Sequence, residues 1–168
     1  NKVAPAKVFT LPEEEWTTIA DWYKVVVRGA IERTDEFRAV AEAKWPGRFV
    51  TSKSGAAYLE FQAPDTTKAT MLPALREYVE GKVGKPVKIY ACGDYENDLT
   101  MLAAADVAVC PTNALDCVKA IADHCLCHHT EGLIASLIRN IRNKTFWKHT
   151  LCYQLLRLAG WLLKNTWK

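Results

Sequence analysis

Residues 87–110 read VKIYACGDYENDLTMLAAADVAVC, and this stretch decides the fold class. The apolar run 87–92 predicts a buried strand, the segment 97–105 predicts a helix, and the apolar run 107–110 predicts a second strand. Short apolar strands separated by a helix are typical of a β-α-β unit, whose two strands lie parallel in one sheet. The stretch therefore indicates an α/β fold.

The same alternation continues on both sides of this stretch. Helices are expected over 67–81, 114–122 and 131–142, and a further strand is expected over 125–127. Residues 63–143 thus predict part of a doubly wound, Rossmann-like core whose parallel sheet is covered on both faces.

The first 62 residues show another pattern, which predicts a small α+β unit. Two helices and three strands are expected, and the last two strands form a hairpin around Gly55. Their ranges are 11–23 and 34–45 for the helices and 24–27, 49–54 and 57–62 for the strands. Because Pro64 and Asp65 mark a boundary, we divide the chain into residues 1–62, residues 63–143 and a tail, 144–168.

Composition limits the class of protein. The chain has 168 residues, of which 49% are hydrophobic and 24% charged, as is ordinary for a globular protein and not for a disordered one. Its apolar runs are too short for a membrane-spanning helix, which needs about 20 residues. No signal-peptide pattern follows Asn1, so a soluble, cytoplasmic protein is expected.

Charge is divided unevenly along the chain. Residues 1–138 carry 15 lysines and arginines against 19 acidic residues, whereas the residues after them carry seven positive charges and no negative charge. A mildly acidic body argues against nucleic-acid binding, which needs a basic stripe on the folded surface. The tail 144–168 has apolar residues at helical spacing among basic ones, which predicts a helix that contacts a membrane surface or a protein partner. Docking on its own protein and an unstructured end are the alternatives.

Six cysteines in a chain without a secretory signal favour reduced thiols over disulfides. Cys92 and Cys110 lie in apolar runs and are expected in the core. The run 124–129, His-Cys-Leu-Cys-His-His, has residue types that bind zinc, but alternation along a strand would divide them between two faces. A buried strand is the favoured interpretation of that run.

Polar side chains directly follow the strand 87–92. Asp94 lies at its carboxyl end, where ligands of open α/β sheets bind, and Asp98 lies four residues further on with Asn97 beside it. Clustered carboxylates with an amide suit Mg²⁺, which binds one or two carboxylates together with phosphate. Lys68, near the start of the preceding helix, would neutralise a phosphoryl group. Phosphoryl transfer is the prediction; the alternative is that Asn97 and Asp98 cap a helix and Lys68 is a surface lysine.

Six segments with these residues among them occur in a fixed order: Thr67-Lys68-Ala69-Thr70, residues 93–102, residues 105–109, Asn113-Ala114, residues 118–123 and residues 131–135. The set resembles the haloacid dehalogenase superfamily and, within it, the Cof-type hydrolases, which are similar to sugar phosphatases. The resemblance covers about residues 55–140 well and the start of the chain more loosely.

The resemblance implies a role for each site residue. Lys68 matches the lysine that steadies the nucleophile and the transferring phosphoryl group, and Asp94 matches a carboxylate that binds Mg²⁺. Asp98 would support the metal site directly or through water, and Asn97 would help orient the phosphate. Residues 1–62 would be the C-terminal part of an α/β cap that selects the substrate and shields the site from water.

The most serious departure of the chain from the family pattern concerns the nucleophile; a second is Cys110-Pro111, where many relatives have small residues. Family members attack phosphate with the first aspartate of a D-x-D motif and form an aspartyl-phosphate, but no D-x-D occurs in these 168 residues. We therefore expect the C-terminal part of a longer Mg²⁺-dependent phosphatase of small phosphorylated metabolites such as sugar phosphates, inactive without its upstream nucleophile. The alternative is a non-catalytic binding module that uses the tail 144–168 to reach a membrane or a partner.

Overall fold

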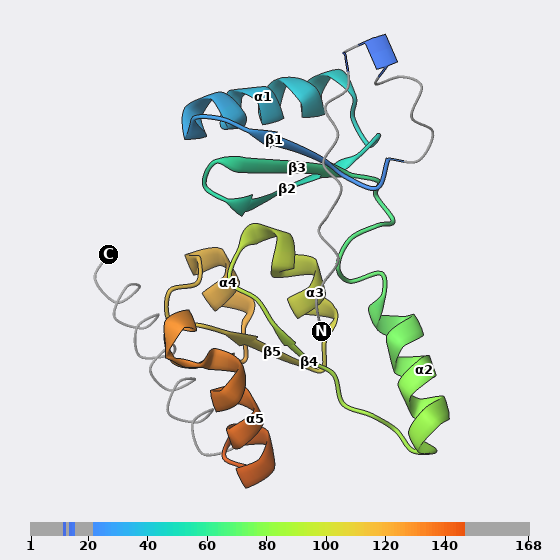
Figure 1. The fold of residues 1–168 in the computed structure, drawn as a ribbon, viewed down its shortest axis with the longest axis vertical. Helices are drawn as coiled ribbons and strands as arrows, with labels where there is room; N and C mark the ends of the chain where they lie inside the picture. Colours follow the sequence, from blue (N-terminus) through green and yellow to red (C-terminus); the bar gives the residue numbers. More distant parts are fainter. Residues whose placement is uncertain (1–11, 13, 16–21, 147–168) are drawn as a thin grey trace, which may run out of the picture.

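A computed structural model describes residues 12, 14–15 and 22–146 of the chain (Figure 1). Within residues 22–146 the strands form two separate three-stranded sheets. Figure 1 shows the first sheet with its helix at the top and the second sheet with its helices below it. This arrangement divides the described chain into an N-terminal unit and a C-terminal unit.

The N-terminal unit is an antiparallel sheet in the order β1-β3-β2 with one helix on its face. Its elements are β1 (Val25–Arg28), α1 (Ile31–Lys44), β2 (Val50–Gly55) and β3 (Tyr58–Gln62). Phe61 on β3 packs edge-to-face against Phe37 of α1 and against Phe49, and Leu59 is fully buried beside them. The predicted hairpin around Gly55 is confirmed, with an irregular register between Lys53 and Gly55.

The other face of this sheet is polar. Ser52 and Glu60 are register partners, and strand alternation puts both on the face opposite Phe61. Both residues are buried, and the Glu60 carboxylate accepts a hydrogen bond from Asn97 of the C-terminal unit. The polar face of the first sheet therefore looks toward the second unit.

The C-terminal unit is a parallel sheet in the order β4-β5-β6, as the sequence predicts. Its strands are β4 (Tyr90–Cys92), β5 (Val107–Cys110) and β6 (His124–Cys125). Every residue of the central strand β5 is buried, because helices cover both faces of the sheet. This is the partial doubly wound, Rossmann-like α/β core expected from residues 87–110.

Two clusters of buried side chains hold the helices on the sheet. On one face, α3 (Leu99–Ala104) and α4 (Asp116–Ile121) pack through Leu102 and Val118 against Ala108 and Cys110. On the other face, Leu137 of α5 (Leu133–Asn143) and Phe146 pack against Val107 and Val109. The alternation of β5 thus fills both cores from a single strand.

Helix starts differ most from the predictions. The helix expected over 67–81 is α2 (Leu72–Val83), because residues 67–71 form tight turns and Pro73 occupies the first helical turn, where proline is favoured. The helix expected from Thr34 begins at Ile31, and the Thr34 hydroxyl bonds to the Ile31 carbonyl from inside the helix.

Two predictions concern the ends of the chain. Of the helix expected over 11–23, residues 11, 13 and 16–21 lie outside the described residues, and Trp22 and Tyr23 are not helical. The part of the tail 144–168 that follows Phe146 also lies outside the described residues. Within the described residues, none of the helices has the length and apolar content that crossing a membrane requires.

Candidate active site

The loop after β4 is built around the side chain of Asp98. Its Oδ2 accepts hydrogen bonds from the backbone N–H groups of Asp94, at 3.0 Å, and Tyr95, at 3.4 Å. Gly93 makes this approach possible, because a Cβ atom there would lie 2.4 Å from the Cβ of Asp98. A short 3-10 turn, η2 (Glu96–Asp98), then leads directly into α3. The predicted helix over 97–105 is therefore divided into η2 and α3.

Lys68 meets this loop from the turn before α2. Its Nζ lies 2.5 Å from Oδ1 of Asp98, although the two residues are 30 positions apart in the sequence. The Asp98 side chain is only 8% exposed, whereas that of Lys68 is 45% exposed. Asp98 thus anchors the lysine beside the loop and leaves part of the ammonium group open to solvent.

Asp94, Lys68 and Asp98 line one open cleft of about 550 Å³. The cleft lies at the carboxyl ends of β4 and β5, since Cys92 and Pro111 also line it. Asp94 is exposed there, and among the described residues no cation lies within ion-pair distance of its carboxylate. This is the edge of an open α/β sheet at which ligands bind.

The carboxylates of this cleft differ in how well they suit a Mg²⁺ ion. Asp94 offers an exposed, hard oxygen ligand, and Mg²⁺ characteristically binds through one or two carboxylates, several waters and a phosphate. Both oxygens of Asp98 already accept hydrogen bonds, from Lys68 and from the loop amides. No group of three or more histidine, cysteine, aspartate or glutamate side chains with metal-binding geometry occurs in the described residues. Asp94 therefore presents an exposed carboxylate to the cleft, whereas the carboxylate of Asp98 is occupied by Lys68 and the loop amides.

Asn97 and Glu96 point toward the N-terminal unit. The Asn97 side chain donates a hydrogen bond to the carboxylate of Glu60, and Glu96 receives two hydrogen bonds from Arg38 of α1. Asn97 does not line the cleft that holds Asp94. Of the four predicted site residues, the structure therefore brings Lys68, Asp94 and Asp98 together and holds Asn97 on the neighbouring side of the loop.

A family model for haloacid dehalogenase-like hydrolases matches residues 4–138 of the chain. The chain belongs to the haloacid dehalogenase-like hydrolase family. No match was found among curated proteins. Lys68, Asp94, Asn97 and Asp98 all fall inside the matched range.

Solved structures of this family share the fold. A haloacid dehalogenase (HAD)-like hydrolase from B. subtilis matches with a TM-score of 0.58 and 21% identity over 70% of this chain and 40% of its own. A HAD/COF-like hydrolase from Plasmodium vivax matches with a TM-score of 0.68 and 19% identity over 78% of this chain and 45% of its own. A HAD subclass IIB sugar phosphatase matches with a TM-score of 0.56 and 19% identity over 71% and 43%. The chain spans less than half the length of each of these hydrolases.

The thiol of Cys92, which lines the cleft, and the thiol of Cys110 on the neighbouring strand both have pKa values above the usual one. Burial raises the pKa of Cys92, and the charges of Asp94 and Asp98 raise it further. Burial, together with the neighbouring thiol of Cys125, raises the pKa of Cys110 to about 12. Because a thiolate is the nucleophilic and metal-binding form, these thiols act as apolar side chains. The run 124–129 shows no metal-binding group within the described residues.

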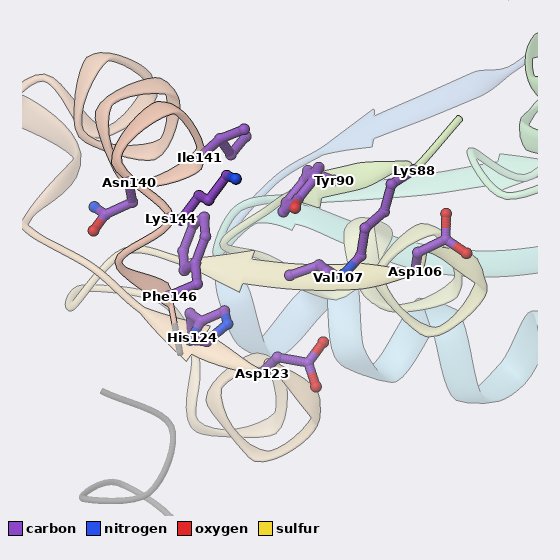
Figure 2. Close-up of a pocket in the computed structure, with 10 residues that line it drawn as sticks. All are labelled: Lys88, Tyr90, Asp106, Val107, Asp123, His124, Asn140, Ile141, Lys144 and Phe146. Carbon is purple, nitrogen blue, oxygen red and sulfur yellow. The ribbon is translucent and has the colours of Figure 1, made fainter. Parts of the chain in front are cut away.

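A second cavity, of about 250 Å³, lies at the opposite end of the parallel sheet (Figure 2). Tyr90, Val107 and His124, the first residues of the three strands, line it. Phe146 closes one side, with its ring stacked near Tyr90 and tilted against His124. Its position at the amino ends of the strands separates it from the residues of the candidate active site.

The residues that join the loop to the N-terminal unit were not among the predicted site residues. Arg38 and Glu60 lie 58 and 37 positions before their partners Glu96 and Asn97, and no local pattern links them. His129 and residues 132–135 also line the cleft. Their position after β6, at the same edge of the sheet as Asp94, is the signal that identifies them.

Proposed function

We propose that this chain carries the metal-binding and phosphate-binding half of a Mg²⁺-dependent phosphatase that acts on small phosphorylated metabolites such as sugar phosphates. The observation that carries the proposal is the ion pair between Lys68 and Asp98. It lies beside the exposed Asp94, at the carboxyl edge of a parallel sheet. Membership of the hydrolase family and the sugar phosphatase among the structural neighbours support the substrate class.

Each residue of the cleft has a distinct proposed task. Asp94 would hold the metal ion, and the bound ion would neutralise charge on the phosphate oxygens. The Lys68 ammonium would contact a second phosphate oxygen, and Asp98 would keep that ammonium in place. Asn97 would reach the phosphate only by leaving Glu60, to which it is hydrogen-bonded here.

The nucleophile of the proposed reaction is not among these residues. No D-x-D motif occurs in the 168 residues, and the exposed Asp94 is assigned to the metal. We therefore place the aspartate that forms the aspartyl-phosphate in sequence upstream of this chain, and we expect the chain alone to release no phosphate from sugar phosphates.

Metal binding by the 168-residue chain tests the proposal without a need for activity. Mn²⁺ is a paramagnetic substitute for Mg²⁺, and we expect it to broaden the amide NMR signals of residues 93–98. Asp94→Asn should abolish this broadening, because an amide is a much weaker ligand for a hard cation. Glu77→Gln is the control, since Glu77 is exposed on α2 and does not line the cleft.

Two results would contradict the proposal. One is equal broadening at residues 93–98 in the wild-type chain and in Asp94→Asn, which would place the ion elsewhere. The other requires a longer protein, in which a segment with the D-x-D motif precedes this chain. If that protein still releases phosphate from sugar phosphates in a Mg²⁺-dependent way after Asp94→Asn, then Asp94 is not the metal ligand.

A further inference from the structure

Arg38 of the N-terminal unit is hydrogen-bonded to the loop that carries Asp94 and Asp98. Arg38 lies on α1, and its Nη1 and Nη2 donate hydrogen bonds to Oε2 and Oε1 of Glu96, at 3.1 and 2.5 Å. Two parallel bonds between a guanidinium and a carboxylate fix both distance and orientation, which a single ammonium contact does not. Glu96 lies two residues after Asp94 and two before Asp98.

The guanidinium of Arg38 is also hydrogen-bonded to residues of its own unit. Its Nε donates to Oγ1 of Thr51 on β2, at 2.9 Å, and to Glu42 of the same helix, at 3.2 Å. Thr51 in turn donates its hydroxyl to Glu42. Because these contacts already restrict the long side chain, less conformational entropy is lost when the fork closes on Glu96.

A second contact fastens the neighbouring residue of the loop to the same unit. Asn97 is bonded to the carboxylate of Glu60, which is buried in the first sheet and paired with Lys24 at 2.8 Å. Two consecutive loop residues are thus tied to α1 and β3, which lie in a unit whose sheet is separate from that of β4. From the other side, Asp98 and the Leu115 amide hold the loop to the C-terminal unit.

We infer that Arg38 is a positioning residue: through its fork on Glu96, the N-terminal unit sets the conformation of the loop that presents Asp94 and Asp98 in the cleft. The assignment of a positioning role in catalysis rests on the proposed function, whereas the mechanical coupling between Arg38 and the loop does not. Figure 1 shows the first sheet above the C-terminal unit. The loop that carries Asp94 and Asp98 also carries Glu96, which receives the two hydrogen bonds from Arg38.

Hydrogen exchange of individual amides in the 168-residue chain tests the coupling. Arg38→Lys keeps the charge but cannot form the fork, and Glu96→Gln removes the charge of its partner. We expect either variant to speed exchange of the Asp94 and Tyr95 amides, which bond to Asp98, by about three- to tenfold. Exchange in the β4-β5 ladder should not change. The double variant should exchange only slightly faster than either single variant, because both substitutions remove the same contact.

Arg76 supplies a matched control within the C-terminal unit. It pairs with Asp106 at 2.7 Å across 30 residues, with side chains about a third exposed, but it does not touch the loop 93–98. Arg76→Lys should therefore leave the exchange of Asp94 and Tyr95 unchanged. Wild-type exchange rates in Arg38→Lys, or an equal acceleration in Arg76→Lys, would overturn the coupling.

Mn²⁺ affinity separates a positioning role from a structural one. We expect Arg38→Lys to weaken Mn²⁺ binding at residues 93–98 several-fold at a temperature at which both chains are fully folded, and Arg76→Lys to leave it unchanged. Faster exchange with unchanged Mn²⁺ affinity would overturn the positioning role. If the wild-type chain binds no Mn²⁺ at all, the proposed function fails, while the exchange rates still decide whether Arg38 controls the loop.

Discussion

At the scale of single residues, the candidate site depends on a glycine. Gly93 lies against Asp98 so closely that a methyl group at position 93 would meet the Cβ, Cγ and Oδ2 atoms of that side chain at 2.4 to 2.7 Å. Asp98 cannot retreat without loss of its bonds to the loop amides and to Lys68. We expect Gly93→Ala to destabilise the chain by about 2 kcal/mol, measured as a lower free energy of unfolding in urea.

A glycine-to-alanine substitution should have the opposite effect on stability at Gly81. Gly81 lies inside α2 without a positive φ, and a methyl group added there would meet no atom within 4 Å. Gly81→Ala should therefore raise the free energy of unfolding by about 0.5 to 1 kcal/mol through its helix propensity. An unchanged free energy of unfolding in Gly93→Ala would show that the Asp98 side chain is not fixed as described.

Residues of the site differ in how far the sequence could predict them. Asp94 and Asp98 follow a strand directly, so their place at the edge of the sheet was predictable from one short stretch. Lys68 was singled out by its place near the start of a predicted helix and by its place among the family segments, and its 2.5 Å contact with Asp98 required the structure. Arg38 and Glu96 form their fork between two units with separate sheets, and neither charge pattern nor spacing in the sequence indicates such a pair.

At the scale of elements, the buried strands and helices of the C-terminal unit were predictable from the sequence, but the residues at which they begin and end were not. The four apolar residues of β5 match the predicted strand 107–110 because a central parallel strand is covered on both faces. The start of α2 moved by five residues because turns near Ala69 and the position of Pro73 outweigh the helical pattern before them.

The middle strand of the first sheet carries a charge that makes stability depend on pH. Burial raises the pKa of Glu60 on β3, but hydrogen bonds from Lys24, Ser54 and Asn97 outweigh it and hold the pKa below its usual value near 4.5. A lowered pKa in the folded state stabilises the chain above the unfolded pKa, and this contribution is lost as the pH falls through the folded value. We expect Glu60→Gln to lower the free energy of unfolding by about 1 kcal/mol at pH 7.

Urea unfolding of the wild-type and Glu60→Gln chains between pH 3 and pH 7 measures this effect. The difference between the two chains should be largest above about pH 5 and should shrink toward zero at the acid end. Glu36→Gln is the control, because Glu36 is exposed on α1. A difference that grows as the pH falls would show that Glu60 is destabilised, not stabilised, by its surroundings.

At the scale of the whole molecule, the described fold ends with a residue that belongs to the core. Phe146 is 9% exposed and packs with Val107, Val109 and Leu137 on one face of the parallel sheet. A chain that ends at Phe146 keeps this packed ring. Removal of three more residues, to Asn143, should lower the free energy of unfolding by up to about 3 kcal/mol, because the packed aromatic ring is lost.

The residues after Phe146 carry the last prediction, which concerns a membrane surface. Residues 147–168 contain four lysines and arginines and no acidic residue, and each such charge near an anionic membrane is worth about 1 kcal/mol. We expect the full chain to sediment with vesicles that contain phosphatidylserine, and to be released at high salt, because the attraction is screened. The chain that ends at Phe146 keeps the core residue and should stay in solution. Equal binding by both chains would assign the contact to the folded units and remove the proposed role of the tail.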